Sequence, residues 1–297
     1  EYFLSQISKS DDKSIFISIA EERARSEVKA SAIRYATNKS LGPLDGVPVV
    51  WKDLIDVVGL PTTCGAEIFR YREPPTVDAK IVQNCAAAGM IVLGKVNLTE
   101  FAFSGLGLNP HYGTPVNPHG TNKRCVPGGS SSGSAVSVAA GLAPIGIGTD
   151  TGGSVRIPAA FNGLVGYKSS EGHIDKSGVH PLSHTLDTVG PIAKSVNDCV
   201  LMERVLRAEH VVAPRSATLE DMKLLVPKNL IYDDASDCVI KNFKRCLELL
   251  EKKGISIRHC HFDVFDSMIE SSAKHGTLAT AESFYTLGKF IDGQERD

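Results

Sequence analysis

The sequence predicts an α/β fold, in which strands and helices alternate along the chain and build one sheet. A strand-like apolar run at 47–51 is followed by a helical pattern at 76–88 and by a buried-looking strand at 90–94. The same order returns with a helix of small residues at 133–142 and an apolar strand at 143–148. Alternation of this kind is typical of a sheet covered by its connecting helices.

The N-terminal elements are predicted from periodicity and from caps. Apolar residues recur among charged ones from about 14 to 37, which indicates a surface helix. In the helix at 76–88, Thr76 is expected as the cap, and Ile81 and Cys85 fall on one apolar face. Gly89 stands where a helix-ending glycine belongs.

The C-terminal half continues the alternation. A further strand is expected at 164–168, and Ser195 opens a helix that has an acid placed for a capping box. The polar stretch 209–221 is the only plausible linker, so we expect a single domain over 1–297. The remaining expected elements are a strand at 222–226, an amphipathic helix at 237–253 closed by Gly254, and a strand at 255–258.

Composition fits a globular protein with a large core. The 297 residues are 42% hydrophobic and 22% charged, and the net charge is −2. This charge provides no basic field for nucleic acid or an anionic membrane, and no apolar run reaches the ~20 residues that span a bilayer. We therefore expect no nucleic acid and no membrane as partners. Seven scattered cysteines favour free thiols in a reducing compartment, and hence a cytoplasmic protein.

Two clusters of glycine and serine between Cys125 and Ala160 carry the chemistry. Three adjacent hydroxyls, beginning with Ser130, stand at the expected start of the helix at 133–142, where the helix dipole is positive. Ser154 follows Thr-Gly-Gly, whose backbone N–H groups can converge because glycine has no Cβ. This is the local chemistry of a nucleophile beside an oxyanion hole.

The two clusters resemble the amidase signature family, serine hydrolases that cleave amide bonds with a Ser-Ser-Lys triad. The resemblance implies a central mixed, twisted β-sheet with helices on both faces. Family members usually continue beyond the region matched by residue 297, so the chain is expected to lack the C-terminal part of the family fold. The matching motifs are Gly-Pro-Leu-Asp-Gly-Val-Pro-Val-Val-Trp-Lys-Asp at 42–53, Gly-Gly-Ser-Ser-Ser-Gly-Ser-Ala at 128–135, Thr-Asp-Thr-Gly-Gly-Ser-Val-Arg-Ile-Pro-Ala at 149–159, Gly-Leu-Val-Gly-Tyr-Lys at 163–168 and Leu-Asp-Thr-Val-Gly-Pro at 186–191.

By this resemblance, Lys52, Ser130 and Ser154 form the catalytic triad. Neutral Lys52 would accept the proton of Ser130, which takes that of Ser154 as an acyl-enzyme forms. The family has a cis peptide bond before the bridging serine, here Gly129–Ser130. The other implied site residues are Thr151, Gly152, Gly153 and Ser154 as the oxyanion hole, and Asp150 and Arg156 as supports of the loop.

Each member of this triad also has a purely structural interpretation. A lone lysine is usually on the surface, but Lys52 ends a buried-looking strand, where desolvation lowers its pKa and lets it act as a base. Ser130 and Ser154 could each be no more than a helix N-cap.

A rival enzyme hypothesis makes Ser131 the nucleophile, because 129–133 also matches the Gly-x-Ser-x-Gly elbow of α/β-hydrolases. Such an elbow needs a strand directly before it, whereas the preceding residues 117–127 are loop-like and contain two prolines. The rival is therefore disfavoured. Its acid and base would be Asp187 and one of His210, His259 and His261.

Metal and nucleotide sites are also disfavoured. His259 and His261 have a spacing that metals use, but zinc needs three or four ligands and no further cluster with ligand spacing lies nearby. The loop at 128–135 lacks the Gly-Lys-Ser/Thr ending of a phosphate-binding loop. We expect no metal and no cofactor.

Two departures from the family's glutamine amidases bear on the substrate. The amidase component of tRNA-dependent amidotransferases commonly has Gln where Ile157 stands, and Tyr-Gly-Arg where Gly172 and His173 stand. We therefore expect a stand-alone amidase for a small-molecule amide or a urea-like compound. A glutamine amidase subunit of a tRNA-dependent amidotransferase and a catalytically idle binding subunit stay as alternatives, and a homodimer stays open.

Overall fold

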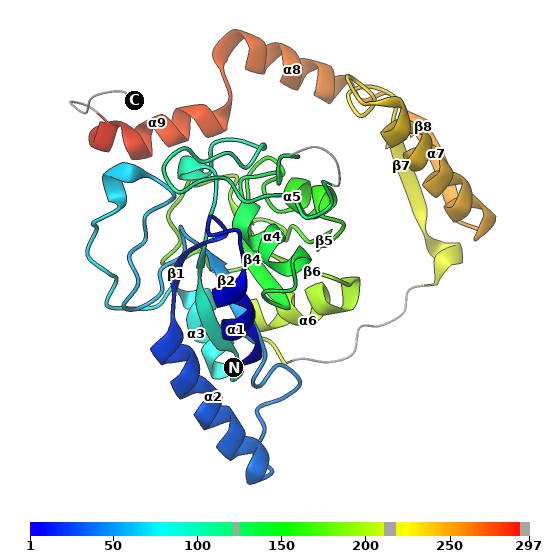
Figure 1. Cartoon of the computed structure of the whole chain (residues 1–297). Helices are drawn as coiled ribbons and strands as arrows, with labels where there is room; N and C mark the ends of the chain where they lie inside the picture. The colour runs from blue at the N-terminus through cyan, green and yellow to red at the C-terminus, as the bar shows by residue number, and fades with distance from the viewer. Residues whose placement is uncertain (121–124, 211–217, 292–297) are drawn as a thin grey trace. The chain divides into compact units, whose positions relative to one another are not determined.

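The computed structural model describes residues 1–120, 125–210 and 218–291, and its main element is a six-stranded sheet (Figure 1). The strand order is β1-β3-β2-β4-β6-β5. β2 is parallel to β3 and β4, whereas the other pairings are antiparallel, so the sheet is mixed. The strands are β1 Phe16–Ile19, β2 Pro48–Lys52, β3 Ile91–Val96, β4 Ile145–Asp150, β5 Val165–Gly166 and β6 Thr188–Ala193.

Helices cover both faces of this sheet, as predicted. Trp51 of β2 packs in a cluster with Ile81 of α3 and Met202 of α6, whereas Val50 packs in another cluster with Ala24 of α2. Among the described residues, no helix combines the length and the apolar character needed to cross a membrane. The helices of this part are α1 Tyr2–Lys9, α2 Glu21–Ala36, α3 Lys80–Ala87, α4 Ser132–Ala139, α5 Arg156–Phe161 and α6 Val196–Leu206, with short 3-10 turns at Glu67–Phe69 and Glu100–Ala102.

The strand β2 is confirmed close to its predicted position, and it lies between two parallel neighbours. Its residues Val49 to Lys52 are buried, because β3 and β4 pair with both of its edges and side chains of the helices cover its faces. A β-branched and aromatic sequence suits a strand of this kind. The consequence for the site is that Lys52 ends a rigid central strand inside the core.

A close approach between α4 and β4 brings the serine cluster onto the sheet. A Cβ at Gly146 would lie 2.6 Å from the carbonyl oxygen of Ser134, so only glycine fits there. The hydroxyl of Ser134 donates to the carbonyl of Ile147 at 2.9 Å. The N-terminal turn of α4 is therefore held directly against β4.

The predicted helix from 14 to 37 is only partly right. Phe16–Ile19 forms the edge strand β1, and the helix α2 begins at Glu21. The reason is non-local, because β1 pairs antiparallel with β3 and gives its backbone groups partners that an isolated segment lacks. The Phe-Ile-Ser-Ile sequence is itself compatible with a strand.

The predicted starts and ends of the helices are only partly confirmed. Helix α3 begins at Lys80 and not near Thr76, because backbone hydrogen bonds join the residues just before it to other loops, including one from Ala79 N–H to the carbonyl of Asp56 at 2.9 Å. Its end is confirmed, since Gly89 follows with φ of +79°. The cap of α6 is also confirmed, because the hydroxyl of Ser195 accepts the N–H of Asp198 at 3.1 Å.

Among the described residues, 218–281 form a second compact unit, and 1–120, 125–210 and 282–291 belong to the first. The boundary lies inside the predicted linker 209–221, of which 211–217 falls outside the described residues. The single domain expected over 1–297 stays a prediction. In the second unit, β7 and β8 pair with each other in a sheet of their own. The elements of this C-terminal region are β7 Lys223–Pro227, α7 Asp237–Lys252, β8 Ser256–Cys260, α8 Asp263–His275 and α9 Leu278–Ile291, after a 3-10 turn at Leu219–Asp221.

Substituting the glycine under α4 tests the close approach to β4. We expect Gly146→Ala to lower the free energy of unfolding by about 1–3 kcal/mol, because the new methyl group overlaps the carbonyl of Ser134. Urea unfolding followed by the fluorescence of Trp51, the single tryptophan, measures this.

The matched control is Gly288→Ala on α9, where the nearest atom to a new Cβ is 3.9 Å away. This change should stabilise by roughly 0.5–1 kcal/mol, since alanine favours a helix. Equal stability of Gly146→Ala and the unaltered chain would contradict the close approach.

Candidate active site

Lys52, the predicted base, lies at the centre of a buried polar cluster. Its side chain is fully buried. The amine donates hydrogen bonds to the Ser130 hydroxyl at 2.6 Å and to the Thr149 hydroxyl at 2.9 Å. Because Lys52 ends a central strand, its amine is directed toward these hydroxyls and away from bulk water.

The electrostatic environment favours the neutral amine. Burial lowers the pKa of Lys52 from its ordinary 10.5 to about 7, against the opposing effect of the carboxylates of Asp187 and Asp150. Lys95 on β3 is equally buried, but its amine forms an ion pair with Asp53 at 2.8 Å. Lys52 contacts neutral hydroxyls instead, so a substantial fraction of it carries a free lone pair near pH 7.

Ser130 lies two residues before the start of α4, and its peptide bond with Gly129 is cis, as predicted. Its side chain is fully buried, and its carbonyl accepts the N–H of Thr99 at 3.1 Å. The N-cap position of α4 belongs to Ser131. The structural interpretation of Ser130 as a helix cap is therefore wrong, and its hydroxyl engages Lys52.

Ser154 stands in the turn between β4 and α5, and Asp150 organises this turn. The carboxylate accepts the backbone N–H groups of Gly153, Val155 and Arg156 at 2.7, 3.2 and 3.3 Å. The guanidinium of Arg156 adds two bonds of 2.9 Å. Burial opposes ionisation of Asp150, but these donors hold its pKa below the ordinary range. The N-cap of α5 is Val155, so Ser154 is not a cap either.

The two serine clusters meet through their backbones. The N–H of Ser131 donates to the carbonyl of Ser154 at 3.2 Å. The hydroxyl of Ser131 is fully buried and donates to the carbonyl of Thr149 at 3.4 Å, while Ser154 is 8% exposed. Cys125 to Gly129 form no strand, so the arrangement that a nucleophile elbow at Ser131 requires is not present there.

The structure removes one of the predicted hydrogen-bond donors from the oxyanion hole. The N–H of Gly153 is already committed to the carboxylate of Asp150. The predicted donors that remain are the N–H groups of Thr151, Gly152 and Ser154. Gly152 is exposed, and in the part of the chain that the structure describes a Cβ there would meet nothing within 4 Å, so a substrate carbonyl has space to approach this turn.

The sequence did not predict that Thr149 and Asp187 accept hydrogen bonds in the polar cluster. Thr149 carries no charge but accepts a hydrogen bond from Lys52. Asp187 accepts the hydroxyl of Thr151 at 2.5 Å. Both stand inside motifs that resemble the amidase signature family, next to Asp150 and within Leu-Asp-Thr-Val-Gly-Pro, and this position is the signal that could have identified them.

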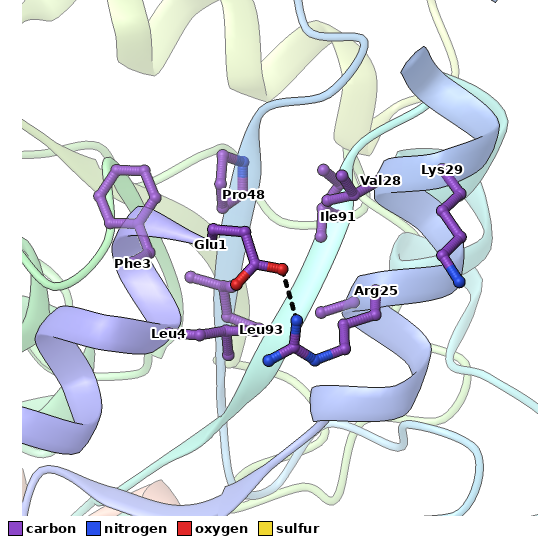
Figure 2. Close-up of a pocket in the computed structure, with 10 residues that line it drawn as sticks. Glu1, Phe3, Leu4, Arg25, Val28, Lys29, Pro48, Ile91 and Leu93 are labelled. Carbon is purple, nitrogen blue, oxygen red and sulfur yellow. Dashed lines mark hydrogen bonds and ion pairs between the residues drawn. The ribbon is translucent and has the colours of Figure 1, made fainter. Parts of the chain in front are cut away.

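A cavity of about 200 Å³ adjoins the polar cluster, because Thr149, Lys176, Asp187 and Thr188 are among the residues that line it. Another cavity, of about 230 Å³, lies between α1, α2 and the sheet (Figure 2). It includes Pro48, at the opposite end of β2 from Lys52, and its lining is mostly apolar, so it is separate from the predicted site.

The region of His259 and His261, where the sequence disfavours a metal site, contains one group of possible ligands among the described residues. His261, Asp263 and Asp266 could together hold a metal ion, whereas His259 is not part of the group. All three side chains are exposed, and His261 already pairs with Asp266 at 2.7 Å. Exposed acids beside a histidine carry no metal assignment by themselves.

Comparison with known proteins shows similarity to enzymes that act on amides. A sequence model of the family described as Amidase matches residues 1–294. One of the subunits of the glutamyl-tRNA(Gln) amidotransferase of Symbiobacterium thermophilum is 36% identical over 292 residues. This match covers 93% of the chain but 58% of that relative, so the chain spans little more than half of its length.

Solved structures support the same grouping and confirm the predicted α/β fold with a mixed sheet. A crystal structure of an amidase has a TM-score of 0.85 at 31% identity, covering 99% of this chain and 66% of that one. The allophanate hydrolase of Kluyveromyces lactis has a TM-score of 0.83 at 29% identity, covering 98% and 48%.

The expectation of no nucleic-acid partner is wrong by this comparison. The curated relatives are named as subunits of a glutamyl-tRNA(Gln) amidotransferase. The physical reason for the error is that net charge reports the long-range field of one chain. It says nothing about an RNA that reaches a protein through other subunits of an assembly.

A lysine that is buried and partly neutral should affect stability in a pH-dependent way. Between pH 7 and 10.5 the unfolded chain holds a proton on Lys52 that the folded chain releases. Across this window the free energy of unfolding of the unaltered chain therefore rises by about 1.4 kcal/mol per pH unit relative to that of Lys52→Met. Urea unfolding at pH 7, 8, 9 and 10 measures the gap, and a gap independent of pH would contradict the lowered pKa.

The matched control is Lys95→Met, which removes the other buried amine. This change leaves Asp53 buried without its ion-pair partner and should destabilise by about 3–5 kcal/mol at pH 7.

Proposed function

Because the chain belongs to the amidase family, we propose that it hydrolyses an amide C–N bond with Ser154 as nucleophile, Ser130 as relay and Lys52 as base. The observation that carries this assignment is the hydrogen bond of 2.6 Å between the Lys52 amine and the Ser130 hydroxyl, both fully buried. A buried amine with a pKa of about 7 has the proton affinity that a general base needs near neutral pH.

In this mechanism neutral Lys52 accepts the proton of Ser130, and Ser130 accepts that of Ser154 as Ser154 attacks the amide carbonyl. The N–H groups of Thr151 and Gly152, with that of Ser154 itself, stabilise the negative charge on the carbonyl oxygen. The proton returns along the relay to the leaving amine, which departs and leaves an acyl-enzyme. Water then attacks the ester by the same relay and releases the acid.

For the substrate we propose the side-chain amide of glutamine, with ammonia passed on in an assembly that acts on glutamyl-tRNA. Support comes from the names of the curated relatives, which are subunits of glutamyl-tRNA(Gln) amidotransferases. Partner subunits would then bring the tRNA to this chain.

The buried thiols of Cys64, Cys85 and Cys199 are free, which suits a reducing compartment such as the cytoplasm.

A small amide or urea-like compound is the second candidate substrate. The observation that favours it is Ile157, whose δ-methyl carbon would lie 2.6 Å from a Cβ on Gly153 in the nucleophile turn. An apolar side chain at this place offers no hydrogen bond to the polar end of a glutamine. Similarity to an allophanate hydrolase points in the same direction.

Serine labelling tests the nucleophile. We expect a fluorophosphonate to modify the peptide that contains Ser154, and Ser154→Ala to abolish labelling and lower amide hydrolysis by roughly 10⁴-fold or more. Mass spectrometry of the digested chain locates the adduct.

The control is Ser131→Ala, which should keep most of the activity because the hydroxyl of Ser131 donates to a backbone carbonyl and not to Lys52 or Ser130. An adduct on Ser131 would replace the proposed triad with the nucleophile elbow. A folded chain inert to all amides and fluorophosphonates would indicate a binding subunit.

A substrate panel with a pH series tests the rest of the proposal. We expect kcat/KM to rise through pH 7 as Lys52 loses its proton, and glutamine to be hydrolysed faster than propionamide or biuret. Released ammonia is the measured quantity. Faster turnover of biuret would favour the second candidate, and a rate that falls from pH 6 to 9 would exclude a lysine base.

A further inference from the structure

We propose that Asp187 is a positioning residue that holds the nucleophile turn against β6 and places a negative charge near the Lys52 amine. The inference rests on the proposed function, because it concerns the same reaction. It assigns a role to a residue that neither the triad nor the loop supports include.

The carboxylate of Asp187 joins two loops. One oxygen accepts the hydroxyl of Thr151 at 2.5 Å. The other accepts the backbone N–H groups of Leu182 and Ser183 at 2.8 and 3.1 Å. Asp187 is 4% exposed, so these bonds are shielded from competition by water. Thr151 is thereby fixed at the first position of the turn that ends in Ser154.

The neighbouring residue strengthens this connection. The hydroxyl of Thr188 donates to the carbonyl of Asp150 at 2.9 Å, and β6 pairs with β4 at this point, with Thr188 opposite Asp150. The amine of Lys176 donates to the carbonyl of Asp187 at 2.9 Å. Two consecutive residues therefore fix the start of the nucleophile turn, one through a backbone carbonyl and one through a hydroxyl.

The carboxylates of Asp187 and Asp150 have different surroundings. The carboxylate of Asp150 is paired with the guanidinium of Arg156. The donors that contact the carboxylate of Asp187 are a hydroxyl and two backbone N–H groups, all neutral. The Lys176 amine bonds to the backbone carbonyl of the same residue and partly offsets this charge, but the carboxylate still favours the protonated form of Lys52.

Two carboxylates act on Lys52 with the same sign. Those of Asp187 and Asp150 both raise the proton affinity of the amine against the effect of burial. Removing the charge of Asp187 should therefore move the titration of Lys52 to lower pH. A residue with a merely structural role would not move this titration in a defined direction.

The first experiment separates the hydroxyl contact from the fold. We expect Thr151→Val to slow acylation by a fluorophosphonate about tenfold or more, because the turn loses its side-chain attachment to Asp187. Thr151→Ser keeps the hydroxyl and should recover most of the rate. The rate of adduct formation in the full chain is the measured quantity.

The second experiment measures the effect of the Asp187 charge on the titration of Lys52 without an activity assay. Lysine labelled with ¹³C and ¹⁵N, assigned with Lys52→Met, reports the titration of Lys52 by NMR. We expect Asp187→Asn to move its midpoint down by roughly one pH unit, and the rising limb of the acylation rate to move with it. Asp175→Asn is the matched control, since Asp175 lies in the same loop and its carboxylate bonds to Ser177 N–H at 2.7 Å.

The outcomes are distinct. An unaltered rate in Thr151→Val, or an unmoved Lys52 titration in a folded Asp187→Asn, overturns the role of Asp187. If Asp187→Asn does not fold, the comparison of Thr151→Val with Thr151→Ser decides whether Asp187 positions the turn. If the unaltered chain forms no adduct at Ser154, the proposed function fails, and the NMR titration still decides whether Asp187 sets the proton affinity of Lys52.

Discussion

The burial of the Lys52 amine among hydroxyls is the constraint on which the rest of this site depends. A charged amine in the interior needs a counter-ion or loses its proton, and Lys52 donates to two neutral oxygens, those of Ser130 and Thr149. The strand that carries it has parallel partners on both edges, so the side chain cannot escape to water by a small backbone movement. Its low proton affinity therefore follows from the architecture of the sheet.

Two buried lysines on adjacent strands illustrate how the partner decides the chemistry. The amine of Lys95 is paired with Asp53, and the carboxylate of Asp53 also accepts the N–H of Thr63 at 3.1 Å. This pair is locally neutral and suits a structural role. Lys52, one residue before Asp53, has the same burial without an ion pair. Equal burial thus accompanies a pairing with a carboxylate at one position and a candidate base at the other.

The fold was predictable where its determinants are local, and prediction failed where they are long-range. The strand at Lys52, the glycine after α3 and the cap at Ser195 were all predicted, since each depends on a few adjacent residues. The edge strand β1 and the strand β6 were not, because each exists through pairing with residues distant in sequence. The predicted start of α3 was wrong for a related reason, since hydrogen bonds to other loops hold the preceding residues outside the helix.

By itself the sequence determined which residue types could perform amide hydrolysis, because glycine-rich turns, adjacent hydroxyls and a strand-terminal lysine are properties of short segments. The cis bond before Ser130 was implied by the resemblance of these motifs to the amidase signature family. Only the tertiary structure decided that Lys52 also meets the Thr149 hydroxyl, that the N–H of Gly153 is committed to Asp150, and that Asp187 lies against Thr151. The physical reason is that hydrogen bonding and desolvation depend on distances of a few ångströms between segments that lie up to about one hundred residues apart, and only the packed sheet sets those distances.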